Sequence, residues 1–171
     1  MHTSFRVANL VGALGLALAD RLADACAPAG SSSAAAALVL LHERRPGATI
    51  DAVARVVGLS HSGTVRLADR LAAAGLVERR RAADHRSAAL YLTPAGRRAA
   101  RRILVGREAS LRSALTFLTD DQQARLGELA EVILGGLAAQ PEAERRLCRL
   151  CDLEACGRAR GHCPVAARRR T

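Results

Sequence analysis

The segment of residues 49–93 most constrains the fold, because it joins two closely spaced helix signals to a hairpin signal. Thr49 can cap a helix that ends at Gly58 in a left-handed turn. Ser60 can cap a second helix only two residues later. Two short helices joined by a glycine-containing turn are typical of a helix-turn-helix.

The second of these helices is predicted to have two different sides. A rotation of 100° per residue places five residues on an inward side: Thr64, Val65, Ala68, Leu71 and Ala72. The opposite, more polar side carries Ser62, Arg66, Asp69, Arg70 and Ala73. Small residues at the N-terminus allow close approach to a partner, and Arg66 can reach a guanine edge in a DNA major groove. The alternative is an ordinary solvated face.

The hairpin signal follows directly, with strands predicted at Val77–Arg81 and Ala88–Leu92 and a connection at residues 82–87. Leu90 and Leu92 are expected to face inward. Residues 79–107 contain nine arginines and one acid, Asp84, which can hold the loop or orient Arg86. A charge run at this place predicts a phosphate-binding wing, for which we select Arg79, Arg81 and Arg86.

Further helices flank this lobe. Residues 7–19 are apolar enough for a signal peptide, but Asn9 and Asp20 interrupt the run, which is shorter than the roughly 20 residues that span a bilayer. A packed helix is therefore expected there. A second helix is predicted from a cap at Ser33 through His42.

On the other side of the lobe, Thr93 and Pro94 are expected to begin a long helix. Residues 119–122 form a capping-box pattern that opens a final helix, whose apolar side carries Leu126, Leu129, Ile133 and Leu137. Together with the N-terminal helix, this is more apolar surface than a small lobe requires. A two-fold homodimer on a palindromic DNA site is expected.

These motifs resemble the MarR family of transcription regulators over most of residues 5–140. The resemblance rests on Leu-Ser-x-Ser-x-Thr-Val-Arg-Leu-x-Asp-Arg-Leu from residue 59, Gly-Leu-Val-Glu-Arg-Arg from residue 75, Asp-x-Arg from residue 84 and Leu-Thr-Pro-x-Gly from residue 92. It implies a homodimer of winged helices that usually represses nearby genes, with an effector pocket between dimerisation helices and the DNA-binding lobe. By position it assigns Arg86 to the wing tip and six residues to the recognition helix: Ser60, Ser62, Gly63, Thr64, Arg66 and Arg70.

The predicted fold class is mainly α with a small β-hairpin, a winged helix-turn-helix with N- and C-terminal dimerisation helices. Residues 1–140 are expected to form the MarR-like domain, with the DNA-binding lobe at about 47–93. Residues 141–171 form a cysteine-rich tail.

Four of the five cysteines lie in this tail, at Cys148, Cys151, Cys156 and Cys163. Four thiolates satisfy tetrahedral zinc, and glycines at 157 and 161 permit tight turns, so the tail predicts a structural zinc site, in which His162 could replace Cys163. An iron–sulfur cluster, reversible disulfides and unbound thiols are the alternatives. Without metal, the tail has too few apolar residues to order alone. Cys26 is expected to be a small buried hydrophobe.

Composition agrees with a nucleic-acid partner. The net charge is +10, and all 26 basic residues are arginine, which coding bias explains as well as phosphate binding does. Aromatic residues make up 2% of the chain, which disfavours a surface that stacks single-stranded bases. No arrangement of nucleophile, base and orienting group is recognisable, so an enzyme is not predicted.

The sequence thus predicts a cytoplasmic, sequence-specific regulator that binds double-stranded DNA, a repressor released by a small-molecule or redox signal and without a membrane role. A redox-sensing regulator built on iron–sulfur or thiol chemistry, a metalloenzyme, and a zinc-knuckle interaction module without DNA binding are the alternatives.

Overall fold

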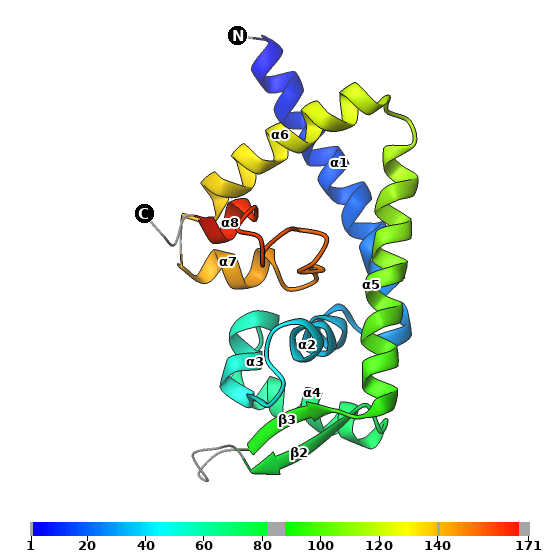
Figure 1. Cartoon of the computed structure of the whole chain (residues 1–171), viewed down its shortest axis with the longest axis vertical. Coiled ribbons are helices and arrows are strands. Elements are labelled where there is room, and N and C mark those ends of the chain that lie inside the picture. The colour runs from blue at the N-terminus through cyan, green and yellow to red at the C-terminus, as the bar shows by residue number, and fades with distance from the viewer. Residues whose placement is uncertain (1, 82–87, 140, 168–171) are drawn as a thin grey trace.

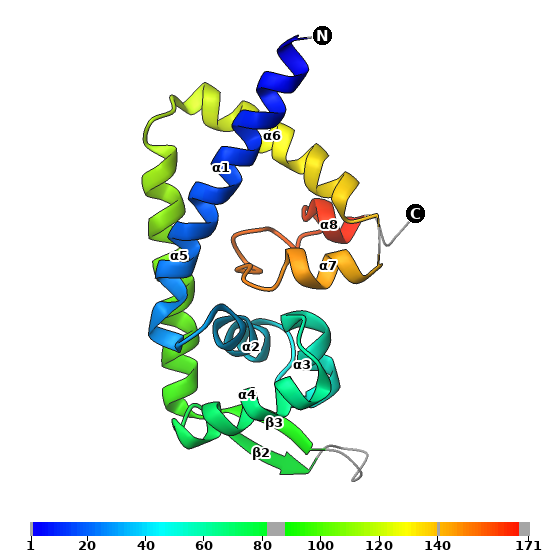
Figure 2. The same cartoon turned by 180° about the vertical axis from the view of Figure 1, so that it is seen from behind.

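The computed structural model describes residues 2–81, 88–139 and 141–167 (Figure 1). A lobe of short helices and a sheet forms one end of the molecule, and long helices extend from it (Figures 1 and 2). The elements in order are α1 (His2–Cys26), a 3-10 turn (Ala27–Ala29), α2 (Ser32–Glu43), β1 (Ala48–Thr49), α3 (Ile50–Val57), α4 (His61–Ala73), β2 (Val77–Arg81), β3 (Ala88–Leu92), α5 (Pro94–Leu115), α6 (Asp120–Leu137), α7 (Pro141–Leu147) and α8 (Pro164–Ala167).

Helix α2 is the centre of the core. Every residue from Ala34 to Leu41 is buried, so the helix is covered on all sides rather than along one stripe. Helices α3 and α5 and strand β3 pack around it. The helix begins two residues earlier than predicted: Ser31, not Ser33, is the N-cap, because its Oγ accepts a hydrogen bond from the Ala34 amide at 3.1 Å.

The helix-turn-helix prediction is confirmed in its local details. Thr49 caps α3 by accepting from the Ala52 amide, and Gly58 ends α3 in the left-handed conformation, with φ of 73°. Ser60 caps α4. The predicted fold class, mainly helical with a small sheet, is confirmed as well.

The sheet has one strand more than the predicted hairpin. Strands β2 and β3 pair with the predicted bounds, and Leu90 and Leu92 are buried. The two-residue strand β1 adds to the other edge of β3, with Ala48 opposite Leu90, giving the order β1-β3-β2. The predicted loop at residues 82–87 lies outside the described residues.

The long helices follow their predicted signals. Helix α1 packs against α5, and none of the helices in the described ranges is long and apolar enough to cross a membrane. Thr93 caps α5, and Thr119 and Gln122 form the predicted capping box at α6. Helix α6 is not the final helix, because α7 and α8 follow it and fold back between α6 and the lobe (Figure 2).

The junction between the sheet and α5 requires a glycine. A Cβ at Gly96 would lie 1.9 Å from the Leu76 carbonyl oxygen, which itself accepts from the Thr93 amide at 3.1 Å. The backbone of the β2 entry and the first turn of α5 therefore approach each other as closely as they can.

We predict that Gly96→Ala lowers the free energy of unfolding by about 1–3 kcal/mol, because the new methyl group must displace backbone. Gly106→Ala in the same helix is the control, since its Cβ would meet only atoms of Ala25, the nearest of them the Cβ at 3.7 Å, which is ordinary van der Waals contact. That change should raise stability by up to about 1 kcal/mol through helix propensity. Urea denaturation of both variants gives the measurement, and an equal effect of the two would contradict the assigned close approach.

Candidate nucleic-acid interface and cysteine cluster

The N-terminus of α4 is an exposed cluster of hydroxyl groups. The Ser60 Oγ accepts from the Gly63 amide at 3.1 Å and lies 3.3 Å from the Ser62 Oγ. A Cβ at Gly63 would come within 3.2 Å of the Ser60 Oγ, so the glycine makes room for the cap itself. The first amides of α4 and two small side chains thus face solvent, where a phosphate or base edge could approach.

The two predicted sides of α4 are observed. Of the predicted inward residues, Thr64, Ala68 and Leu71 are buried and Val65 and Ala72 are half-buried, and Leu67, which the prediction did not assign to a side, is buried as well. The predicted outer residues are exposed: Ser62, Arg66, Asp69, Arg70 and Ala73. Neither Arg66 nor Arg70 forms an ion pair with another residue in the described ranges. Both guanidinium groups are therefore available to a partner.

Thr64 was included among the predicted DNA-binding residues, and the structure corrects its role. Its side chain is completely buried, and its Oγ1 donates to the Ser60 carbonyl oxygen at 2.9 Å. Thr64 cannot reach a base or phosphate. It stabilises the first turn of α4, in agreement with the helical periodicity that placed it on the inward side.

The wing is attached to α4 by Arg79. Its guanidinium forms an ion pair with Asp69 at 2.9 Å and donates to the Val65 carbonyl oxygen at 3.4 Å. The sequence predicts Asp69 on the outer face and Arg79 as a DNA contact, and in the structure these two residues pair and fix strand β2 against α4. Arg81, at the end of β2, is exposed, and Arg86 lies outside the described residues.

Arg80, the next arginine on β2, contacts one residue of its own strand and one of β3. Arg80 forms an ion pair with Glu78, and its guanidinium lies over the Tyr91 ring, 4.9 Å from the ring centre. A cation over an aromatic face is an attractive arrangement. Arg80 thus stiffens the hairpin.

A further contact joins the two helices of the helix-turn-helix. The His61 Nδ1 lies 2.7 Å from the Asp51 Oδ1, linking the first turn of α4 to the first turn of α3. Both side chains are 66% exposed. The two residues lie ten positions apart in the chain, so the spacing rules of helix caps give no signal for this contact.

Cys148 and Cys163 are buried in a second cluster with Ala138 and Val165, separate from the main core, and the partly buried Cys151 and Cys156 pack against this cluster. The four cysteines associate in pairs. The Cys151 thiol donates to Cys148, and Cys156 and Cys163 are hydrogen-bonded to each other. The fifth cysteine, Cys26, lies 2% exposed in the main core, as predicted.

The environments of the paired thiols differ. The hydrogen bond from Cys151 and, after it, the Arg44 guanidinium lower the pKa of Cys148 to about 6, although burial opposes this shift. The hydrogen bond to Cys148, followed by burial, raises the pKa of Cys151. Cys148 is thus the thiolate of its pair, and Cys151 the thiol.

The four cysteines provide donor atoms that suit a metal ion, but their side chains are not arranged around a single point as metal ligands are. Four sulfur donors suit zinc and iron–sulfur clusters alike. Gly157 and Gly161 adopt positive φ values of 64° and 79° in the predicted turns. Within the described ranges, however, no three His, Cys, Asp or Glu side chains are grouped to hold a metal ion. Cys163 is buried whereas His162 is exposed, so Cys163 is the residue that joins the cluster.

Glu43 ties the tail to the rest of the chain, whereas Glu144 forms an ion pair inside the tail. The Glu43 Oε2 at the end of α2 accepts from the Leu153 amide at 3.0 Å. Glu144, only 5% exposed, pairs with Arg158 at 2.9 Å within the tail. In addition, α7 packs against α3, and α8 against α6. The sequence predicts too few apolar residues for the tail to order alone, and the structure shows that the tail packs against α2, α3 and α6 instead of standing alone.

Comparison with known proteins gives a consistent result. Residues 31–87 match the model of the MarR family. A MarR-family transcriptional regulator from Rhodococcus sp. RHA1 is 24% identical, with 76% of this chain and 93% of that one covered and a TM-score of 0.59. The apo form of wild-type MarR from E. coli is 20% identical, with coverages of 74% and 96% and a TM-score of 0.60. The Mycobacterium tuberculosis MarR-family protein Rv2887 in complex with p-aminosalicylic acid is 24% identical, with coverages of 74% and 96% and a TM-score of 0.56.

No curated protein sequence is similar enough to match the chain. The family match spans the helix-turn-helix and the start of the wing, and the structural matches extend over the flanking helices. The chain therefore has the winged helix-turn-helix fold of the MarR family of transcription regulators, and its residues 31–87 match that family in sequence.

Proposed function

We propose that this protein is a sequence-specific regulator of transcription that binds double-stranded DNA. The observation that carries the proposal is the exposed polar face of α4 beside a wing that Arg79 and Asp69 hold in place. An exposed helix of this kind fits a major groove, and a basic hairpin beside it fits the neighbouring backbone or minor groove. The net charge of +10 adds long-range attraction to the polyanion.

Different residues are assigned different tasks in this complex. Ser60, Ser62 and Gly63 present the amide end of α4 to a phosphate or base edge, and Arg66 and Arg70 reach the bases. Arg81 and Arg86 contact phosphates from the wing. Thr64 and Arg79 position the helix and the wing.

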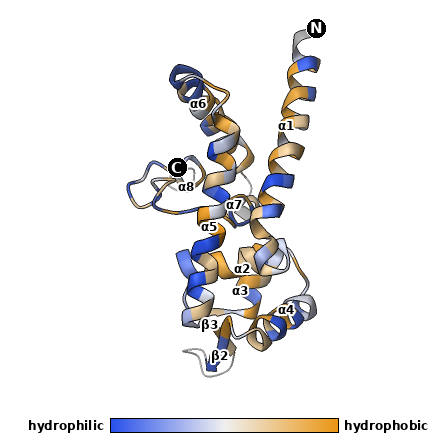
Figure 3. Ribbon diagram, turned by 90° about the vertical axis from the view of Figure 1, so that its right-hand side faces the viewer, coloured by the Kyte–Doolittle hydropathy of each residue, from blue (hydrophilic) through white to orange (hydrophobic). Residues whose placement is uncertain are grey.

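The regulator is proposed to act as a cytoplasmic homodimer. Eleven of the fourteen large hydrophobic side chains that are exposed in the described ranges lie on α1 and α6, among them Leu14 (49%) and Leu129 (62%). Figure 3 shows the apolar stretches of α1 projecting away from the lobe. So large an apolar surface calls for a partner, and a second copy related by two-fold symmetry matches a palindromic operator.

Repression released by a signal is proposed as the regulatory mode. The related fold of Rv2887 carries p-aminosalicylic acid, which supports a small-molecule signal. A bound repressor blocks transcription from nearby promoters, and a signal that alters the angle between α4 and its dimer mate releases it.

The tail is proposed to bind a zinc ion, with Cys148, Cys151, Cys156 and Cys163 as its ligands. The support is the donor set, four cysteines gathered in one cluster with two glycine turns between them. A bound zinc ion would supply the tail with a permanent cross-link. Iron–sulfur binding and a disulfide switch remain the alternatives that the experiment must separate.

The DNA proposal is tested by mobility shift on fragments that the protein selects from genomic DNA. Arg66→Ala should lose roughly 1–3 kcal/mol of discrimination between sites, because a base contact is removed. Arg81→Ala should weaken binding evenly and reduce the salt slope by about 1, because a phosphate contact is removed. Arg125→Ala, on the exposed surface of α6, is the control. Equal small effects of Arg66→Ala and Arg81→Ala would contradict the assigned roles.

The dimer proposal is tested by sedimentation equilibrium. The unmodified protein should have twice the 18.0 kDa mass of one chain. Leu14→Glu or Leu129→Glu should shift the equilibrium to monomer, because a charge replaces an apolar contact. Ala73→Glu, on exposed α4, should remain dimeric. A monomeric parent protein is the result that rejects this proposal.

The metal proposal is tested by elemental analysis of anaerobically purified protein. About one zinc per chain is expected, and Cys151→Ser or Cys156→Ser should lose it, because a four-coordinate site needs all its ligands. Cys26→Ser should keep the metal, since Cys26 lies in the main core. Iron with sulfide in place of zinc would select the cluster, and the absence of both metals would leave only thiol chemistry.

A further inference from the structure

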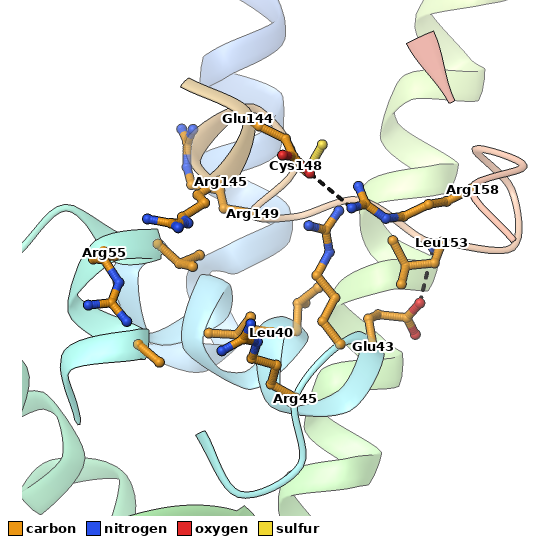
Figure 4. Close-up of a pocket in the computed structure, with 14 residues that line it drawn as sticks. Leu40, Glu43, Arg45, Arg55, Glu144, Arg145, Cys148, Arg149, Leu153 and Arg158 are labelled. Atoms are coloured by element: carbon orange, nitrogen blue, oxygen red, sulfur yellow. Dashed lines mark hydrogen bonds and ion pairs between the residues drawn. The ribbon is translucent and has the colours of Figure 1, made fainter. Parts of the chain in front are cut away.

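A cavity of about 420 Å³ lies between the lobe and the tail. Its walls come from the end of α2, from α3, from α7 and from the segment that contains Leu153 and Arg158 (Figure 4). Cavities of this size hold small organic ligands. The tail lies on the side of α2 and α3 away from the β2–β3 hairpin, so the cavity is separate from the proposed DNA-binding surface (Figure 1).

The cavity is lined by an excess of positive charge. Six arginines line it, against two glutamates, for a formal balance of +4. The arginines are Arg44, Arg45, Arg55, Arg145, Arg149 and Arg158. Figure 4 shows Arg55 of α3 and Arg149 beyond α7 on facing walls. Gathering like charges around one space is unfavourable unless an anion compensates them.

Both glutamates already have partners, one between α2 and the tail and one inside the tail. The Glu43 carboxylate accepts the Leu153 amide, and the Glu144 carboxylate pairs with Arg158. Glu144 is buried, so its charge is committed to the interior of the tail. Arg45, Arg55 and Arg149 form no ion pair with a carboxylate in the described ranges, whereas the Arg44 guanidinium lies beside the Cys148 sulfur, which also lines the cavity.

Three guanidinium nitrogens define where an anion would be held. The Arg44 Nε and Nη2 and the Arg158 Nη1 are buried and have no hydrogen-bond partner among the described residues. Buried polar groups in native proteins nearly always have a partner, because an unsatisfied donor costs free energy. Nε and Nη2 of one guanidinium together form the fork that binds carboxylate or phosphate through two parallel hydrogen bonds.

We propose that this cavity is a binding site for a small anion with a carboxylate or phosphate group, received by Arg44 and Arg158. The anion bridges the lobe and the tail, because Arg44 follows α2 and Arg158 belongs to the tail. Arg55 and Val56 of the same wall lie on α3, the first helix of the helix-turn-helix. A bound anion would therefore contact α3, the helix that packs against α4.

The test uses isothermal titration calorimetry of the full chain without DNA, with succinate and inorganic phosphate as separate probes at constant ionic strength. At least one probe should bind saturably, at about one site per chain. Arg44→Gln should weaken that binding about tenfold or more, because it removes a charge-assisted fork. Binding of succinate alone would identify the group as a carboxylate, and binding of phosphate alone as a phosphate.

Two further variants keep the test decisive. Arg55 is exposed on α3, so Arg55→Gln should fold normally and weaken binding several-fold even if Arg44→Gln does not fold. Arg66→Gln, on the outer face of α4, should leave binding unchanged. No saturable binding of either probe, or loss of binding in Arg66→Gln instead of Arg55→Gln, would overturn the proposal. Because no DNA is present, failure here is distinct from failure of the proposed DNA binding.

Discussion

Burial of α2 is the interaction on which the rest of the structure depends. Leu38, Leu41 and their alanine neighbours are enclosed by α3, α5 and β3, so the helix fixes the lobe, the sheet and the long helices relative to one another. Small alanine side chains on this helix allow the close packing of several elements at once. The same helix ends at Glu43 and is followed directly by Arg44, so the core also positions one wall of the cavity.

The DNA-binding lobe combines rigid support with exposed chemistry. Thr64 and Leu67 anchor α4 from below, and the Asp69–Arg79 pair ties the wing to its outer edge. A surface ion pair adds little stability by itself, but here it restrains the angle between the two elements that are proposed to contact one duplex together. Arg66 and Arg70 take part in no such ion pair in the described ranges, because Asp69 and Arg79 hold α4 and β2 together.

The tail is more than an appendage to this lobe. Glu43 attaches it to α2, the Glu144–Arg158 pair holds it together internally, and its four cysteines contribute to a small cluster at the end of α6. Cys148 belongs to that cluster and also lines the arginine-rich cavity. Cys148 is therefore common to the thiol cluster and the cavity, and α3 lines the same cavity through Arg55 and Val56.

The sequence by itself determined the local features: the caps at Thr49, Ser60 and Thr93, the capping box at Thr119, and the bounds of β2 and β3. Each of these depends on residues within a few positions of one another, so propensity and spacing suffice. Only the tertiary structure decided the pairing of β1 with β3, the partners of Arg79 and His61, and the arginine-lined cavity. These join residues up to 110 positions apart, as in the bond between Glu43 and Leu153, and only the packing of α2, α3 and the tail brings such residues together.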